Sequence, residues 1–214
     1  LLFLGLSPQQ AIATNRFSSL ANVVALFKFH RQGQVKWRLG LFLAAFAGIG
    51  GAFGSFLMVQ LDTEIIEKGI GIILLLSVPM LFVGRKMGLE ERQTKMTKIR
   101  HAGGSFLVLV LGAIGGFFSA MGIWFSYVYL FYYGLTFLQT AAMRKITGLA
   151  IIVVSLAIFL PYGLIQWPIA LAMFVGGGLG SFISAHYSKR LGNGAIRYLF
   201  GAVVLLSALK ILFF

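Results

Sequence analysis

Residues 5–33 read GLSPQQAIATNRFSSLANVVALFKFHRQG, an apolar segment of the length that a membrane helix needs. A related segment returns at residues 134–163, GLTFLQTAAMRKITGLAIIVVSLAIFLPYG. Each copy carries a cation about a third of the way along: Arg16 in the first, and Lys145 with Arg144 beside it in the second. Two related apolar segments with a cation at the same depth are the main indication of function.

The composition predicts an integral membrane protein. Of 214 residues, 59% are hydrophobic and 11% are charged, whereas a soluble domain carries about a quarter charged residues. Residues 39–61, 103–143 and 146–185 contain no Asp, Glu, Lys or Arg, and about 20 apolar residues cross a bilayer as a helix. The alternating pattern of a membrane barrel is absent, so we expect helices.

Several classes of partner and chemistry are not expected. The net charge of +13 comes mostly from short loops, where the positive-inside rule places cations, so nucleic acid is not a predicted partner. The chain has no cysteine, no paired carboxylates and no Ser/His/Asp grouping, so it predicts no enzyme, no catalytic residue, no metal site and no cofactor. The predicted partners are the lipid bilayer and a small anionic substrate, and the oligomeric state is not predicted.

The charges orient the expected helices, which cover residues 7–29, 37–60, 63–84, 139–160, 167–187 and 194–214. Basic loops at 28–38 and 85–102 are expected in the cytoplasm, whereas the acidic turn at 62–64 and the uncharged turn at 161–166 are expected outside. Since the chain starts without methionine inside an apolar run, it is expected to be N-terminally incomplete.

Residues 103–133 contain the glycines of a broken segment. One straight crossing would place the cations Lys189, Arg190 and Arg197 outside. We therefore favour a re-entrant pair of half-helices that enters and leaves on the same side, with the straight crossing as the alternative. The patterns 50–54, 112–116 and 176–180, each Gly-x-x-x-Gly, predict close helix packing.

The chain repeats itself at an offset of 129 residues, which becomes 130 after one slip. The predicted fold is an all-α polytopic membrane protein with two inverted repeats, each a broken or re-entrant segment plus three transmembrane helices, an architecture of secondary transporters. The predicted parts are 1–84 (first repeat, its N-terminal broken segment missing), 85–102 (basic cytoplasmic loop) and 103–214 (second repeat). The matched pairs include Gly5 with Gly134, Gln10 with Gln139, Gly33 with Gly163, and Trp37 with Trp167.

The cations within the spans predict an anion site. A buried arginine is costly in a membrane, so Arg16 is expected to face protein or a cavity, although it could instead snorkel to the surface. Arg144 and Lys145 could anchor their helix, and two adjacent charges are not expected to face one cavity. All five acids lie in loops or at helix ends, which favours anions over cations. The predicted substrate-binding residues are Thr14, Asn15, Arg16, Ser19, Arg144, Lys145 and Thr147.

The order Gly-Leu-Ser-Pro, Ala-x-x-Thr-Asn-Arg, a basic Gly-x-Val-x-Trp loop and a glycine-rich helix is similar to the sulfite exporter TauE/SafE family of permeases, of the toluene sulfonate/sulfite uptake type. The resemblance spans nearly the whole chain. It implies a multi-pass permease of a bacterial-type inner (plasma) membrane for sulfite, sulfonates or other small organic anions. The chain departs from the family where Trp124-Phe125-Ser126 replaces a glycine cluster.

Two functions are carried forward. The first is a secondary transporter that moves a small anion by alternating access at the interface of the two repeats. The second is a non-transporting membrane scaffold or assembly factor that acts through its basic cytoplasmic loop.

Overall fold

The computed structural model of the protein describes residues 1, 4–80, 97–119 and 121–187. The predicted last helix (194–214) and most of the predicted basic loop (85–102) lie outside these ranges. The described residues form helices and no strand, so the predicted all-α class is confirmed for them. The helices are α1 (Pro8–Ser18), α2 (Asn22–Arg31), α3 (Trp37–Gln60), α4 (Thr63–Met80), α5 (Lys98–Phe118), α6 (Gly122–Tyr127), α7 (Phe137–Phe159) and α8 (Trp167–Tyr187).

Most predicted helices are found where the apolar runs placed them. Helices α3 and α8 have the predicted bounds, and α7 begins two residues earlier than expected. Helices α3, α5 and α7 are each long and apolar enough to cross a membrane.

The prediction of one continuous helix over residues 7–29 is wrong. A 3-10 turn, η2 (Ser19–Ala21), separates α1 from α2. The hydroxyls of Ser18 and Ser19 both donate to the carbonyl of Asn15, at 2.9 and 2.7 Å. Such bonds from serine back to the preceding turn compete with the helical ladder and bend helices.

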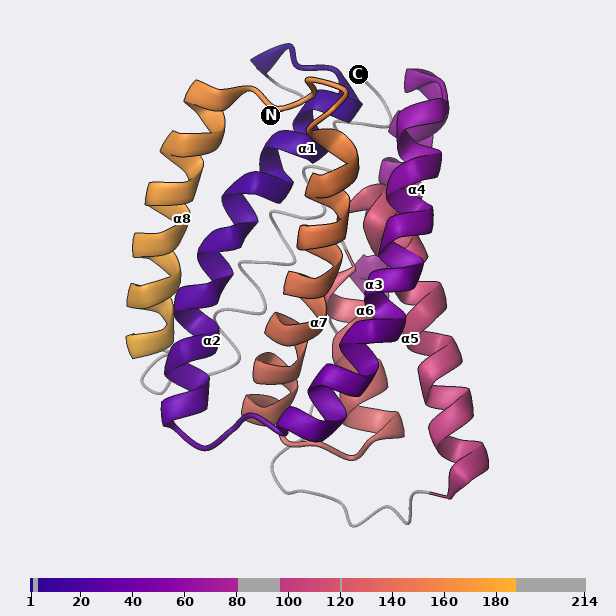
Figure 1. Ribbon diagram of the computed structural model, residues 1–214, viewed down its shortest axis with the longest axis vertical. Helices are drawn as coiled ribbons and strands as arrows, with labels where there is room; N and C mark the ends of the chain where they lie inside the picture. Colours follow the sequence, from indigo (N-terminus) through magenta and orange to yellow (C-terminus); the bar gives the residue numbers. More distant parts are fainter. Residues whose placement is uncertain (2–3, 81–96, 120, 188–214) are drawn as a thin grey trace.

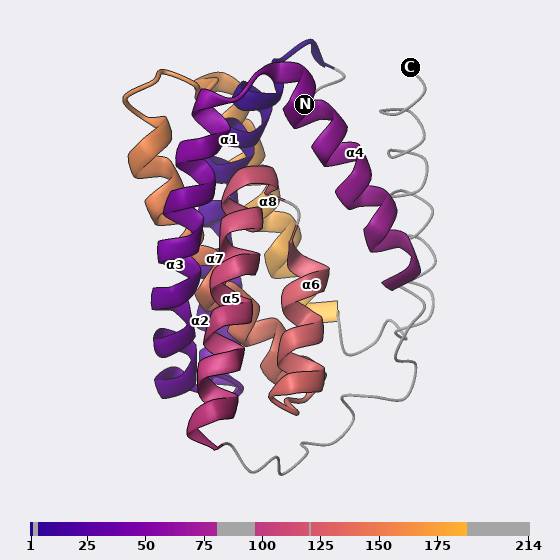
Figure 2. The same cartoon turned by 90° about the vertical axis from the view of Figure 1, so that its right-hand side faces the viewer.

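The broken segment also differs in detail from the prediction. Helix α5 continues through its glycines and ends only at Ser119, which has a left-handed φ of 65°. A residue in this conformation terminates a helix. The chain then returns through α6 and the π-helical turn η3 (Val128–Tyr132). The segment starts with α5 and finishes with η3 at the same end of the bundle (Figures 1 and 2). Its first part, α5, is however a full-length helix and not a half-helix.

Glycines bring α3 and α5 into backbone contact, as the small-residue patterns predicted. A Cβ added at Gly54 would collide with the carbonyl of Ala113, and one at Gly116 with the carbonyl of Gly51. On its other face α3 packs against α7, so that α3 lies between the two other membrane-length helices. The third pattern, on α8, makes no such approach among the described residues.

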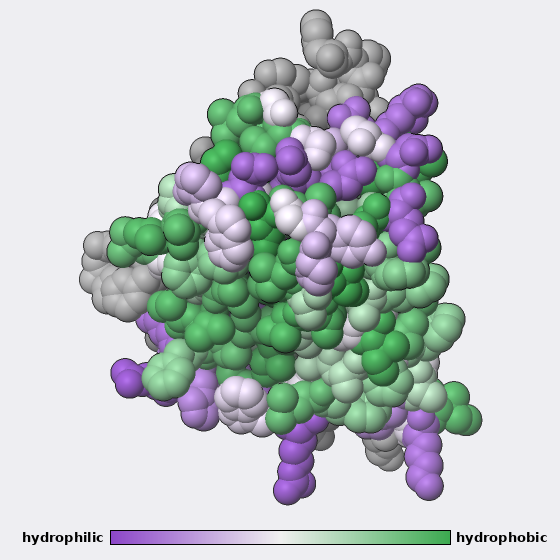
Figure 3. Space-filling view, turned by 45° about the horizontal axis from the view of Figure 1, so that its top comes forward, coloured by the Kyte–Doolittle hydropathy of each residue, from purple (hydrophilic) through white to green (hydrophobic). Residues whose placement is uncertain are grey.

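The charges separate to the two ends of the bundle. The lower end in Figure 1 holds the end of α2 and the starts of α3 and α5, which carry Lys28, Arg31, Arg38 and Arg100. The upper end holds the start of α4, with Glu64 in its first turn. Figure 3 shows a broad hydrophobic belt between hydrophilic margins. Such a belt fits a bilayer.

The two sequence copies have matching local structure. Ser7 and Gln10 form a capping box at the start of α1, and Thr136 and Gln139 form the same box at the start of α7. Left-handed glycines precede both boxes (Gly5 and Gly134) and also follow both segments (Gly33 and Gly163). In Figure 1 the chain descends through α1, α2 and α8 and ascends through α3 and α7.

The contact between α3 and α5 generates a prediction. Gly54→Ala is expected to cost about 1–3 kcal/mol of unfolding free energy, because the added methyl group forces the helices apart. The measurement is equilibrium unfolding of the purified protein in mixed micelles. The control is Gly48→Ala on the same helix, where the nearest atom to the new methyl group would be the Ala150 Cβ at 3.9 Å. Equal stability of the two variants would contradict the close packing.

Candidate functional site

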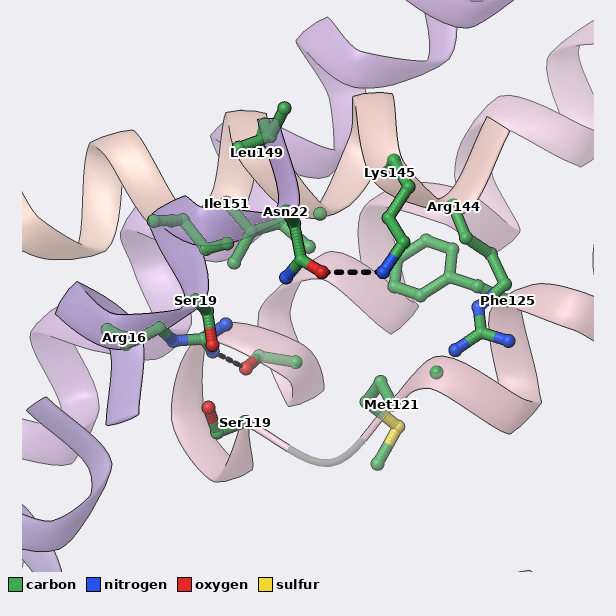
Figure 4. A pocket seen from close by; sticks show the side chains of 14 residues that line it. Arg16, Ser19, Asn22, Ser119, Met121, Phe125, Arg144, Lys145, Leu149 and Ile151 are labelled. Atoms are coloured by element: carbon green, nitrogen blue, oxygen red, sulfur yellow. Dashed lines mark hydrogen bonds between the residues drawn. The ribbon is translucent and has the colours of Figure 1, made fainter. Parts of the chain in front are cut away.

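A cavity of about 170 Å³ lies where the break between α1 and α2 faces the end of α5 and the middle of α7 (Figure 4). Three cations from two helices line it, together with polar side chains and apolar residues. The lining residues are Arg16, Ser19, Asn22, Gly115, Ser119, Met121, Gly122, Phe125, Arg144, Lys145, Gly148, Leu149, Ile151 and Ile152.

Arg16 is buried at this cavity and does not extend to the surface, since only 6% of the residue is exposed. Its Nη2 donates to the carbonyl of Gly115 in the last turn of α5. The carbonyl end of a helix carries partial negative charge, so a cation there is stabilised. The Nε of Arg16 is buried without a hydrogen-bond partner in the described part of the chain. The guanidinium therefore keeps donor capacity for another acceptor.

Lys145 and Arg144 both line the cavity, so the expectation that only one of them could do so is wrong. The Nζ of Lys145 donates to Oδ1 of Asn22 at 2.5 Å, and Nη1 of Arg144 donates to Oγ of Ser126 at 3.0 Å. Figure 4 shows the two side chains leaving α7 side by side and reaching different parts of the cavity. Gly122 makes room for this, because a Cβ there would collide with the guanidinium of Arg144.

Three predicted site residues do not line the cavity but make contacts around it. The hydroxyl of Thr14 accepts from the backbone N–H of Gln166 at 3.1 Å, which ties α1 to the turn before α8. The hydroxyl of Thr147 accepts from the Tyr129 hydroxyl at 3.1 Å. These two polar groups satisfy buried partners and thereby hold the walls in place.

Asn15 holds the turn at the end of α5. Its Nδ2 donates to Oγ of Ser119 at 3.3 Å, and Ser119 is the left-handed residue that ends the helix. A second contact secures the same helix end, since the hydroxyl of Ser55 lies 3.3 Å from the carbonyl of Gly116 and 2.6 Å from the hydroxyl of Ser155. The last carbonyls of α5 are thus bound by side chains from α1 and α3.

The sequence analysis missed Asn22, Ser119, Gly122 and Ser126. Asn22 and Ser126 hold the two cations of α7, and Ser119 and Gly122 shape the wall opposite. A usable signal existed for Asn22, because an amide within an apolar span is costly unless it has a partner. No sequence signal pointed to Ser119, whose role depends on its backbone conformation.

The charge balance of the cavity favours an anion. Arg16, Arg144 and Lys145 line it, and no carboxylate from the described part of the chain does. Among the described residues the acids all lie at or before the first turns of α4, where Glu64 forms an ion pair with Lys68 at 2.6 Å. Three cations close together in a site of low dielectric repel one another, and a bound anion would relieve that repulsion. The geometry is suited to holding an anion by charged hydrogen bonds.

The chain is similar to known membrane proteins. The family described as "Sulfite exporter TauE/SafE" matches residues 1–211. A "Probable membrane transporter protein" of Haemophilus influenzae is 28% identical over 92% of this chain and 77% of its own length. A "Probable membrane transporter protein ORF9" of Sinorhizobium sp. is 24% identical over 99% of this chain and 81% of its own length. No solved structure matches.

The match covers nearly the entire chain, and the similar proteins are described as membrane transporters. Three of the described helices are long and apolar enough to cross a membrane. The chain is a membrane transporter that belongs to the sulfite exporter TauE/SafE family.

Proposed function

We propose that this protein transports a small anion, and that the anion binds in the cavity between Arg16 and Lys145. The observation that carries the proposal is the convergence of three cations from α1 and α7 on one cavity in which no described residue places a carboxylate. Arg16 and Lys145 supply charge, Arg144 supplies a third cation, and the hydroxyl of Ser119, whose oxygen accepts from Asn15, supplies a hydrogen bond. Thr14, Asn15 and Thr147 position these walls.

The proposed substrate is sulfite, a sulfonate or a similar small anion. Support comes from the family to which the chain belongs and from the lining of the cavity. An oxyanion head would accept from the guanidinium and ammonium groups. Phe125 and Met121 would contact a small apolar substituent.

The proposed mechanism is alternating access between two inverted repeats, residues 1–84 and 103–214. The matched capping boxes, the matched left-handed glycines and the opposite directions of the matched helices in Figure 1 support it. Inverted repeats place a substrate site at their interface, and the cavity lies between α1 of the first repeat and α7 of the second.

The proposed setting is the inner membrane of a bacterial-type cell, crossed several times, with the lower end of Figure 1 in the cytoplasm. The cations at that end and the acids at the other support this orientation. The scaffold alternative depends on the loop at 85–102, most of which lies outside the described residues. No observation favours it.

Binding can be tested apart from transport. The purified full chain is heated with sulfite, methanesulfonate or acetate, with sodium chloride at equal ionic strength as the control. A bound ligand stabilises by RT ln(1 + [L]/Kd), about 2.7 kcal/mol at 100 times Kd, so Tm should rise with the concentration of at least one anion. Lys145→Met should remove the rise. An equal rise in that variant would place the anion elsewhere.

Transport should depend on the cations of the cavity. Arg16→Gln and Lys145→Met are each expected to lower anion flux into proteoliposomes tenfold or more, because a hydrogen bond to a charged group contributes about 1.5–3 kcal/mol. Lys98→Met, at the start of α5 and outside the cavity, is the matched control and should retain flux. Arg16 also binds the end of α5, so its loss affects both the charge of the cavity and the fold. Arg16→Lys keeps the positive charge and thereby separates these two effects. Wild-type flux in Arg16→Gln and Lys145→Met would exclude this site.

The inverted arrangement predicts opposite exposure of matched loops. Gln32 and Tyr162 are equivalent at the offset of 130, both are exposed, and the chain has no cysteine. In intact cells an impermeant maleimide should label Tyr162→Cys, whereas Gln32→Cys should react only after permeabilisation. Labelling of both from one side would contradict the inverted repeats.

A further inference from the structure

An apolar groove of about 730 Å³ runs along the outside of the bundle between α3 and α7, away from the charged lining of the anion cavity. Its lining is aliphatic or glycine except for Trp37 at one end. The groove exists because its floor on α3 consists of small residues, among them Ala45, Gly48 and Ala52. Its rims are exposed, with Leu41 and Val153 each 59% accessible. We propose that this groove binds one acyl chain of an anionic phospholipid.

The dimensions of the groove fit an acyl chain. From Trp37 to Ala52 the lining residues follow one stripe of α3 for about 22 Å, at 1.5 Å per residue. One leaflet of the hydrocarbon core is about 15 Å thick, so the stripe is long enough for the chain of a single lipid.

The end of the groove at Trp37 is suited to an anionic headgroup. Trp37 starts α3, and its Nε1 donates to Nδ1 of His30 at 3.1 Å. Arg38 follows Trp37 and is exposed, and α2 ends nearby with Arg31 in its last turn. Tryptophan is favoured at the level of lipid headgroups, and each lysine or arginine near the surface favours anionic lipid by about fivefold. The acids of the described residues lie at the opposite end of the bundle.

Fluorescence of Trp37 tests the proposal. The full chain carrying Trp124→Phe and Trp167→Phe keeps Trp37 as its single tryptophan, since the chain has three. It is reconstituted in phosphatidylcholine vesicles with phosphatidylglycerol brominated in the upper half of its acyl chains, or with phosphatidylcholine brominated in the same way. Bromine quenches only nearby tryptophan, so we expect the phosphatidylglycerol to quench at an at least fivefold lower mole fraction.

Matched variants separate the headgroup from the chain. Arg38→Gln is expected to lower the preference for phosphatidylglycerol about fivefold, and Lys98→Gln, a cation of the same end on another helix, to leave it unchanged. Gly48→Leu fills the groove and is expected to weaken quenching by both brominated lipids, whereas Val110→Leu on the exposed face of α5 is not. Ala45→Leu replaces Gly48→Leu if the latter does not fold.

Three results would overturn the proposal. The first is equal quenching by the two lipids, which would mean ordinary bilayer contact. The second is unchanged quenching in a folded groove-filled variant. The third is oxidative cross-linking of Ile49→Cys between two copies in the bilayer, which would mean that a second copy covers the groove; the chain has no other cysteine to confuse this readout.

Discussion

The cost of a buried cation in a membrane governs the centre of this protein. Arg16 lies within an apolar segment and is almost fully buried, so it requires an acceptor. The acceptor is the carbonyl of Gly115, at the helix end where α5 stops. One interaction thus connects the break between α1 and α2 with the turn at Ser119. Because the Nε of the same guanidinium has no partner among the described residues, the interaction also leaves a donor for an anion.

Close packing of α3 with α5 makes this geometry possible. Backbone contact at Gly54 and Gly116 fixes the depth of α5 in the bundle. Ser55 secures the carbonyl of Gly116, so the end of α5 lies level with Arg16. If a larger side chain held α5 further from α3, the Gly115 carbonyl and the Arg16 guanidinium would be too far apart for a hydrogen bond. Small residues thus position the charged ones.

The anion cavity and the lipid groove share a wall. Leu149 of α7 lines both, with the cavity on one side and the groove on the other. The two sites differ in lining because α7 presents Lys145 toward α2 and aliphatic residues such as Val153 toward the membrane. A single helix therefore separates a charged interior site from an apolar exterior one.

Much of the fold could be predicted from residue patterns. The bounds of α3 and α8 follow from apolar runs that start at Trp37 and Trp167, and Gly-x-x-x-Gly spacing predicted the contact of α3 with α5. The interruption of the first helix could not be predicted, because it depends on serine hydroxyls that bond back to Asn15. The end of α5 at Ser119 could not be predicted either, because the glycines nearby are the residues at which a helix is expected to end.

The sequence by itself determined that this is a helical membrane protein, that it repeats, and that cations lie within its spans without carboxylates. Composition and period are sufficient for those conclusions. Only the tertiary structure decided which polar groups face the cavity. Arg144, Lys145 and Asn22 all line the cavity in the structure. Thr14, Asn15 and Thr147 instead form hydrogen bonds that hold the surrounding elements together. The reason is that long side chains choose partners across helices, and a one-dimensional pattern does not contain the distances between helices.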